Sequence, residues 1–209
     1  DYPIISCRII ARTPVGDFFW PLRYPKPNEF LSEYLFCRRN PISGEGLILP
    51  STIFAKKELL RRVPFNSELR CYEDVEWLLR ASTQRGIGVE FVSKTEPLAI
   101  CHMEEDHSRI TTRLDWNQSL SWIQAIRHLV TPYAYASFIM TRPALFASRQ
   151  GDWKAFLPLL HEAYRYYRPG ILDVLSYLGI WLIPQKAKRL IATFLTRRSR
   201  NVVLKKGNG

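Results

Sequence analysis

The chain has 209 residues, of which 46% are hydrophobic and 13% aromatic, and its formal net charge is +11. This length can form one good core, or one and a half domains, and the apolar content excludes a disordered chain. The 30 Lys and Arg against 19 Asp and Glu favour an anionic partner. No RNA-binding signature, zinc knuckle or helix-turn-helix pattern accompanies the charge, so we expect no nucleic-acid partner.

The ends and the cysteines of the chain limit its setting. The first residue is Asp1 rather than Met, which suggests a piece of something longer or a processed product, and no secretory leader is evident. The longest apolar stretch, 171–183, contains Asp173 and is followed by Pro184, so it is too short to span a bilayer. The four cysteines form no CxxC pair, which favours reduced thiols and a cytoplasmic setting.

The first part of the chain alternates between strand and helix patterns. Residues 3–11 are apolar and β-branched, which predicts a strand. Residues 13–27 hold four prolines, which predicts a long loop, and Asn28 is expected to cap a short helix over 29–38. Beyond the turn at 43–46, the patterns predict helices over 54–62 and 73–84 and strands over 86–92 and 97–101. This alternation predicts an α/β region.

The pattern becomes helical after about residue 112. Breaks are expected where proline or glycine interrupts it, around 131–132, 142–143, 168–170 and 184. Four or five helices with short connections predict an all-α extension. We therefore expect two parts, residues 1–112 and residues 113–209, with a last helix running from Ile171 to about Thr196.

An adjacent acidic pair, Glu73-Asp74, opens the helix expected over 73–84. At about 100° per residue, Glu73 and Glu76 point largely to solvent, whereas Asp74 lies at the edge of the apolar stripe. A carboxylate at such an edge can be half-buried and still reach a cleft, as a general base requires. The alternative is an ordinary acidic first turn, with Glu76 and Arg80 as an i,i+4 ion pair. The helix pattern by itself leaves both open.

The order of the segments resembles a known family. The matching segments are Leu49-Pro50-Ser51-Thr52, the helix 54–60, Val63-Pro64-Phe65-Asn66-Ser67-Glu68-Leu69 and Glu73-Asp74-Val75-Glu76-Trp77-Leu78-Leu79-Arg80, followed by a strand ending before His102. Together they are similar to the second half of a family 2 glycosyltransferase of the GT-A fold, over residues 1–112. The stretch 116–122 further resembles the helical extension of some bacterial members, which act in cell-envelope polysaccharide synthesis.

The resemblance implies an inverting transfer of a sugar from a nucleotide-sugar donor to the hydroxyl of a glycan or lipid-linked acceptor. It implies Asp74 as the base, with Glu73 beside it, and a divalent metal, Mg or Mn. His102 or His107 would be the metal ligand and Arg109 the diphosphate contact. The family's Asp-Gly-Ser segment and Asp-x-Asp motif do not occur in this chain. The chain alone is therefore expected to lack most of the donor site and to be inactive without it.

Three further residues are candidates for substrate binding, each with a structural alternative. Gly44 and Glu45 could approach a sugar or an acceptor, although they could also form a plain turn. Trp77 could stack on a sugar ring, but core packing is the better interpretation, since aromatic side chains are usually buried.

A contrasting class of function is a non-catalytic binding or membrane-surface module. In either class, the basic C-terminal helix could hold the chain peripherally at the inner face of the plasma membrane; the alternative is a terminal helix with a solvated basic tail.

Overall fold

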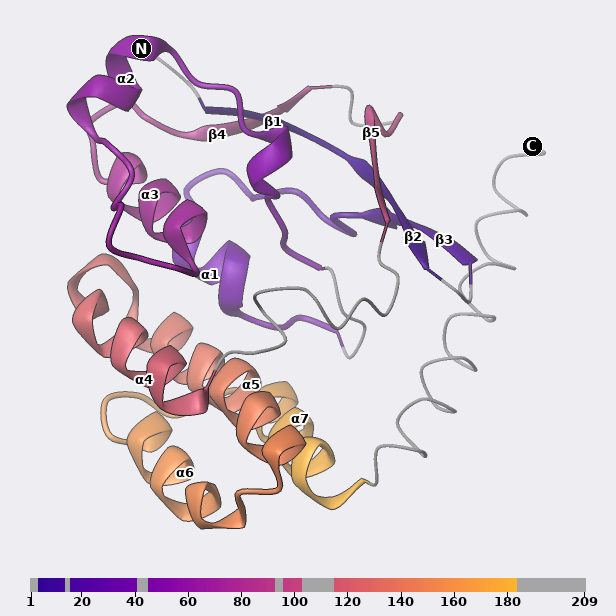
Figure 1. Ribbon diagram of the computed structural model, residues 1–209, viewed down its shortest axis with the longest axis vertical. Coiled ribbons are helices and arrows are strands. Elements are labelled where there is room, and N and C mark those ends of the chain that lie inside the picture. Colours follow the sequence, from indigo (N-terminus) through magenta and orange to yellow (C-terminus); the bar gives the residue numbers. More distant parts are fainter. Residues whose placement is uncertain (1–3, 14–15, 41–44, 93–95, 103–114, 184–209) are drawn as a thin grey trace.

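The computed structural model describes residues 4–13, 16–40, 45–92, 96–102 and 115–183 (Figure 1). Strands and short helices form one part of the molecule, and the C-terminal helices lie together beside it (Figure 1). The fold is thus mixed α/β with small sheets, as the sequence predicts at this coarse level.

The strands form two small sheets. The expected strand over 3–11 is divided at Arg8 into β1 (Ile4–Cys7) and β2 (Ile9–Thr13), which belong to different sheets. Strand β1 pairs in parallel with β4 (Val89–Val92). Strand β2 lies between β5 (Ala99–His102), which is parallel to it, and β3 (Gly16–Trp20), which is antiparallel.

Strand β3 occupies part of the segment expected to be a loop, so that prediction was wrong for residues 16–20. The prolines flank these residues and none lies within them. Gly16 has a φ of 137° at the turn, which favours glycine. Burial alternates along β3, the period expected of a strand with one face covered. The proline content of the longer segment concealed this period.

The helices of this part are short. They are α1 (Leu31–Phe36), the 3₁₀ turn η1 (Pro50–Thr52), α2 (Lys57–Arg62) and α3 (Glu73–Ser82). Asn28 does not cap α1, because its φ is 62° and the N-cap position is Phe30. Helix α2 begins later than expected because the N–H and C=O of Phe54 both bond to Ile5 at 2.8 Å, which keeps Phe54 extended.

The C-terminal part is helical, as expected. Its elements are α4 (Trp116–Ala125), η3 (Arg127–Leu129), α5 (Pro132–Gln150), η4 (Trp153–Ala155), α6 (Phe156–Tyr164) and α7 (Ile171–Leu182). Helix α5 continues through the buried Pro143, so the break expected there was wrong. The helices α1, α4, α6 and α7 all contact α5, and this packing outweighs the lost backbone bond.

Helix α3 joins the two parts. Trp77 and Leu78 belong to a core with Ile4 of β1, whereas Leu79 belongs to the core formed by α4, α5, α6 and α7. The boundary expected near residue 112 lies outside the described residues, as does the final helix expected beyond Leu182. Within the described ranges, no helix is long and apolar enough to cross a membrane.

Candidate functional site

The acidic pair stands at the start of α3, where the backbone is fixed in an uncommon conformation. Tyr72 precedes the helix with φ 66° and ψ 11°, in the left-handed region. A side chain in that region costs about 1–2 kcal/mol, so the surroundings must hold it. The Tyr72 carbonyl nevertheless accepts the first helical bond, from the Glu76 N–H at 2.8 Å.

Side chains of the helical part hold Tyr72 in this conformation. The Tyr72 ring stacks on Trp122 of α4, with centroids 4.3 Å apart, and meets Phe138 of α5 edge-on at 5.7 Å. The Tyr72 and Ser119 hydroxyls are hydrogen-bonded at 3.0 Å. Strained backbone held by tertiary contacts is typical of functional positions, and in this molecule it sets the direction in which α3 and its acidic pair begin.

Asp74 lies half-buried in the first turn of α3, at the edge predicted from the helical wheel. Burial raises the pKa of its carboxyl above the usual value, and the nearby charge of Glu73 raises it further. Hydrogen bonds from the backbone N–H groups of Val75 and of Asp74 itself act in the opposite direction but do not cancel the rise. A carboxyl group with a raised pKa is a better proton acceptor when it is ionised.

Positive charge acts on the residues directly before this turn. Arg142 is one helical turn beyond Phe138 on α5, and it acts electrostatically on both Cys71 and Tyr72. Burial lowers the pKa of Arg38, and the like charge of Arg142 lowers it further. Neither arginine makes a hydrogen bond or an ion pair within the described part of the chain. The negative charges of Asp173 and Glu45 do act on Arg38 and partly offset the lowering of its pKa. No carboxylate contacts Arg142 in the described ranges, so Arg142 can face an anionic group.

The thiol of Cys71 lies in the electrostatic field of both groups. Burial raises its pKa, Glu73 and Asp74 raise it further, and Arg142 lowers it. Carboxylates and an arginine thus act on one half-buried position. Among the described residues, the start of α3 combines the predicted pair Glu73-Asp74 with the positive charge of Arg142.

Two expectations for α3 require correction. Glu76 is buried rather than solvent-facing, because its carboxylate accepts from Asn66 at 3.4 Å and pairs with Arg80 at 3.3 Å; the expected i,i+4 pair is confirmed. Trp77 is fully buried, stacks on Phe65 at 5.0 Å, and donates its indole N–H to the Val63 carbonyl at 2.6 Å. Trp77 is a core residue, since no sugar ring can reach it.

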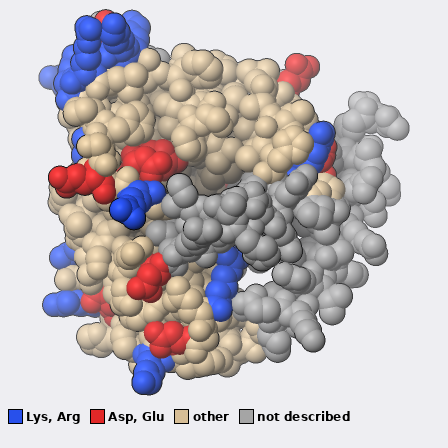
Figure 2. Space-filling view, viewed as in Figure 1, with Lys and Arg blue, Asp and Glu red and all other residues tan. Residues whose placement is uncertain are grey.

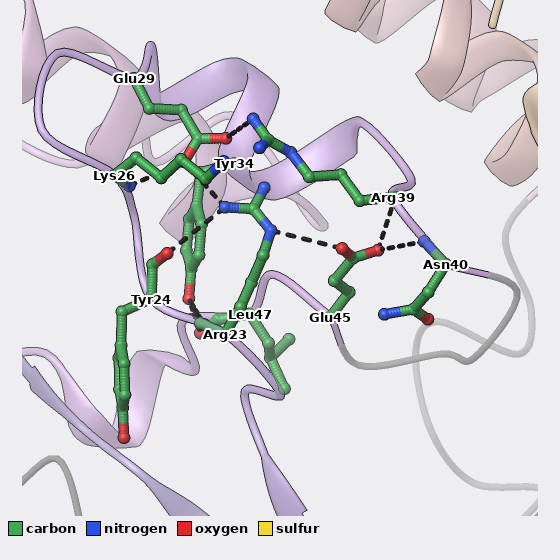
Figure 3. Close-up of polar contacts among 9 residues, drawn as sticks. All are labelled: Arg23, Tyr24, Lys26, Glu29, Tyr34, Arg39, Asn40, Glu45 and Leu47. Atoms are coloured by element: carbon green, nitrogen blue, oxygen red, sulfur yellow. Dashed lines mark hydrogen bonds and ion pairs between the residues drawn. The ribbon is translucent and has the colours of Figure 1, made fainter.

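Glu45 belongs to an internal network of charges (Figure 3). Its carboxylate accepts the backbone N–H of Arg39 at 2.7 Å and that of Asn40 at 3.1 Å, and it pairs with Arg23 at 3.5 Å. Arg23 also pairs with Glu29 at 2.7 Å. Both Glu45 oxygens therefore have partners inside the chain, which shows a structural role in place of the substrate contact expected from sequence.

The glycine beside Glu45 is required by packing. A Cβ on Gly46 would lie 1.7 Å from the Tyr34 carbonyl oxygen, so no other residue fits at this close approach. The Tyr34 hydroxyl in turn donates to the Arg23 carbonyl at 3.2 Å. Gly44, the other candidate in this turn, lies outside the described residues.

Of the two histidines expected as metal ligands, only His102 lies within the described residues. His102 is exposed at the end of β5, whereas His107 and Arg109 lie outside the described residues. In the part of the chain that the structure describes, no three His, Cys, Asp or Glu side chains gather as a metal site would require. Among the described residues, His102 therefore remains a candidate for a single ligand.

Comparison with protein-family models, with curated proteins and with solved structures found no match to this chain.

Sequence reasoning missed three residues of the candidate site: Tyr72, Arg38 and Arg142. Arg142 precedes a proline and was hidden by the break expected there. A signal for Tyr72 existed in its position directly before the acidic pair, but a positive φ cannot be read from a tyrosine. Arg38 follows the end of α1 and carries no local pattern.

Proposed function

We propose that this chain is the acceptor-side part of a nucleotide-sugar glycosyltransferase with a GT-A-like fold, in which Asp74 is the general base. The observation that carries the proposal is the half-buried Asp74, whose raised pKa and fixed position suit proton transfer. Its neighbour Glu73 sustains the raised pKa and borders the acceptor. The donor site requires residues of the complete enzyme beyond the segments that carry the resemblance.

The chemistry assigned to Asp74 is a single proton transfer. Its carboxylate accepts the hydrogen of an acceptor hydroxyl while that oxygen forms a bond to C1 of the donor sugar. The bond between C1 and the diphosphate oxygen breaks at the same time, and the nucleoside diphosphate leaves with both bonding electrons. Attack from the opposite face inverts the configuration at C1, and a divalent ion, where bound, would offset charge on the leaving group.

The arginines support an anionic substrate at the same place. Arg142 makes no ion pair in the described ranges and acts on the residues directly before the acidic pair, whereas Arg38 lies in the field of Asp173 and Glu45. A phosphate group of the donor, or of a lipid-linked acceptor, would complete the hydrogen bonding of Arg142. The preorganised positive charge would also stabilise the departing diphosphate.

The proposal is tested by incubating the full-length protein that contains this chain with a panel of nucleotide sugars and extracted lipid and glycan acceptors. Mass spectrometry should detect loss of one nucleotide sugar, release of its nucleoside diphosphate, and a product heavier by one hexose. A full-length protein that consumes no nucleotide sugar with any acceptor would favour the contrasting proposal, a non-catalytic binding module.

A further inference from the structure

An apolar surface runs along the outer side of the last two described helices. On α7, large hydrophobic side chains recur at i, i+4, i+7 and i+11, and all are exposed: Ile171 at 80%, Leu175 at 59%, Leu178 at 39% and Leu182 at 67%. This spacing forms one helical stripe. Such a stripe is normally buried against the core, so its exposure on α7 indicates a surface that binds a partner.

Helix α6 extends the stripe into a continuous face. Trp153 and Leu157 are 58% and 69% exposed, and Trp153 meets Trp181 of α7 with ring centroids 5.2 Å apart. A groove of about 590 Å³ separates the two helices, with apolar residues along it and Leu157 and Leu178 on its opposite sides. The exposed members define the α6–α7 face: Trp153, Leu157, Tyr164, Ile171, Leu175, Leu178 and Leu182.

The charges around the α6–α7 face are almost all positive. Exposed basic residues accompany it at Arg149, Lys154, Arg165 and Arg168. The acidic residues of the same segment have partners within the chain: Asp173 is buried against Ser137 at 2.6 Å, Glu162 accepts from Tyr135 at 2.6 Å and pairs with Arg165 at 3.5 Å, and Asp152 accepts from Trp116 at 2.9 Å. The next stretch of sequence, 184–209, contains eight Lys or Arg and no Asp or Glu.

We infer that the α6–α7 face docks on an anionic phospholipid bilayer, with the apolar stripe in the interface and the basic residues at the headgroups. Exposed aliphatic residues with aromatic and basic neighbours are the composition that binds such surfaces. A second copy of the chain would bring like charges together around the same face, which opposes self-association. Because α6 lies at the end of the molecule farthest from the strands (Figure 1), docking there leaves the start of α3 accessible.

A second basic surface provides a control. Figure 2 shows a dense group of Lys and Arg over α2, formed by Lys56, Lys57, Arg61 and Arg62, all of them exposed. It lies at the opposite end of the molecule from α6 (Figure 1). The two surfaces cannot both rest on one flat bilayer, so variants at each end distinguish them.

The test is co-sedimentation of the full chain with vesicles of phosphatidylcholine plus phosphatidylglycerol, and with vesicles of phosphatidylcholine alone. We expect binding to the anionic vesicles only, and a fall in the partition coefficient of about tenfold or more for Leu175→Gln with Leu182→Gln. The matched control, Leu60→Gln with Leu98→Gln, removes two other exposed leucines and should bind within about twofold of wild type. Because vesicle binding is measured without turnover, its result is independent of the catalytic proposal.

Three outcomes would overturn the inference. Binding retained in the Leu175/Leu182 variant but lost in Lys57→Glu with Arg61→Glu would place the contact on α2. Equal binding to both kinds of vesicle would remove the role of anionic lipid. A concentration-dependent dimer that the Leu175/Leu182 variant disperses, seen by light scattering without vesicle binding, would assign the α6–α7 face to a second copy.

Discussion

Removing the Tyr72 hydroxyl should weaken the link between α3 and the helical part. In Tyr72→Phe the ring remains, so its stack on Trp122 at 4.3 Å is kept, and only the 3.0 Å hydrogen bond to Ser119 is lost. A hydrogen bond contributes about 1 kcal/mol, and an unsatisfied buried hydroxyl costs about 1–3 kcal/mol. Because Ser119 is fully buried, we expect the free energy of unfolding to fall by about 2 kcal/mol.

A double-mutant cycle isolates this interaction. Ser119→Ala together with Tyr72→Phe removes both polar groups, so the double variant should lose only about 1 kcal/mol or less. Urea unfolding of the four proteins, followed by far-ultraviolet circular dichroism and tryptophan fluorescence, gives the coupling energy. Tyr164→Phe serves as the control, since Tyr164 is 47% exposed and its hydroxyl has no hydrogen bond within the described ranges. Simple addition of the two single effects would refute this explanation of how α3 is fixed.

Three further predictions concern packing and pH. Trp77→Ala should lower the free energy of unfolding by about 3–5 kcal/mol in urea titrations, whereas a surface role for Trp77 would leave it within about 0.5 kcal/mol. Burial raises the pKa of Asp74, so wild-type stability is fully present below the unfolded pKa of about 4 and is lost as pH rises through the folded pKa. Urea titrations should show Asp74→Asn more stable than wild type near pH 7, with the difference vanishing below about pH 3; an Asp74→Asn protein no more stable than wild type near pH 7 would contradict this. Burial alone would raise the pKa of Glu29, but Arg23 and its other partners lower it below its usual value. The contribution of Glu29 to the free energy of unfolding should therefore be lost as pH falls below about 4. In urea titrations at a series of pH values, Glu29→Gln should show a smaller loss of stability over that range than wild type.

The start of α3 was predictable because local pattern determines it. The acidic pair, the apolar spacing and the half-buried position of Asp74 all follow from helical periodicity, and the structure confirms them. Glu76 was placed wrongly, and the sugar contact considered for Trp77 fails, for the opposite reason. Helix α3 contacts two cores, so its buried face is wider than one apolar stripe, and partners distant in sequence cover the rest.

The remaining differences arise from competition between local signals and tertiary packing. Five residues without proline form β3 inside a proline-rich stretch, and α5 continues through Pro143 because neighbouring helices surround it. Glu45 was expected to approach a substrate or to form a plain turn, yet it is buried and bound by Arg23 and two backbone N–H groups. Such long-range partners leave no periodic trace in the sequence.

The most direct test of the role of Asp74 is Asp74→Asn in the full-length protein, with Glu58→Gln on the surface of α2 as the matched control. Sugar transfer and donor binding are measured separately, by product mass and by calorimetric titration with the nucleotide sugar. We predict that Asp74→Asn lowers the transfer rate by at least about 10²-fold, as loss of a general base does, while donor affinity stays within about twofold. Transfer near the wild-type rate in a folded Asp74→Asn protein would contradict the assignment of Asp74 as the base.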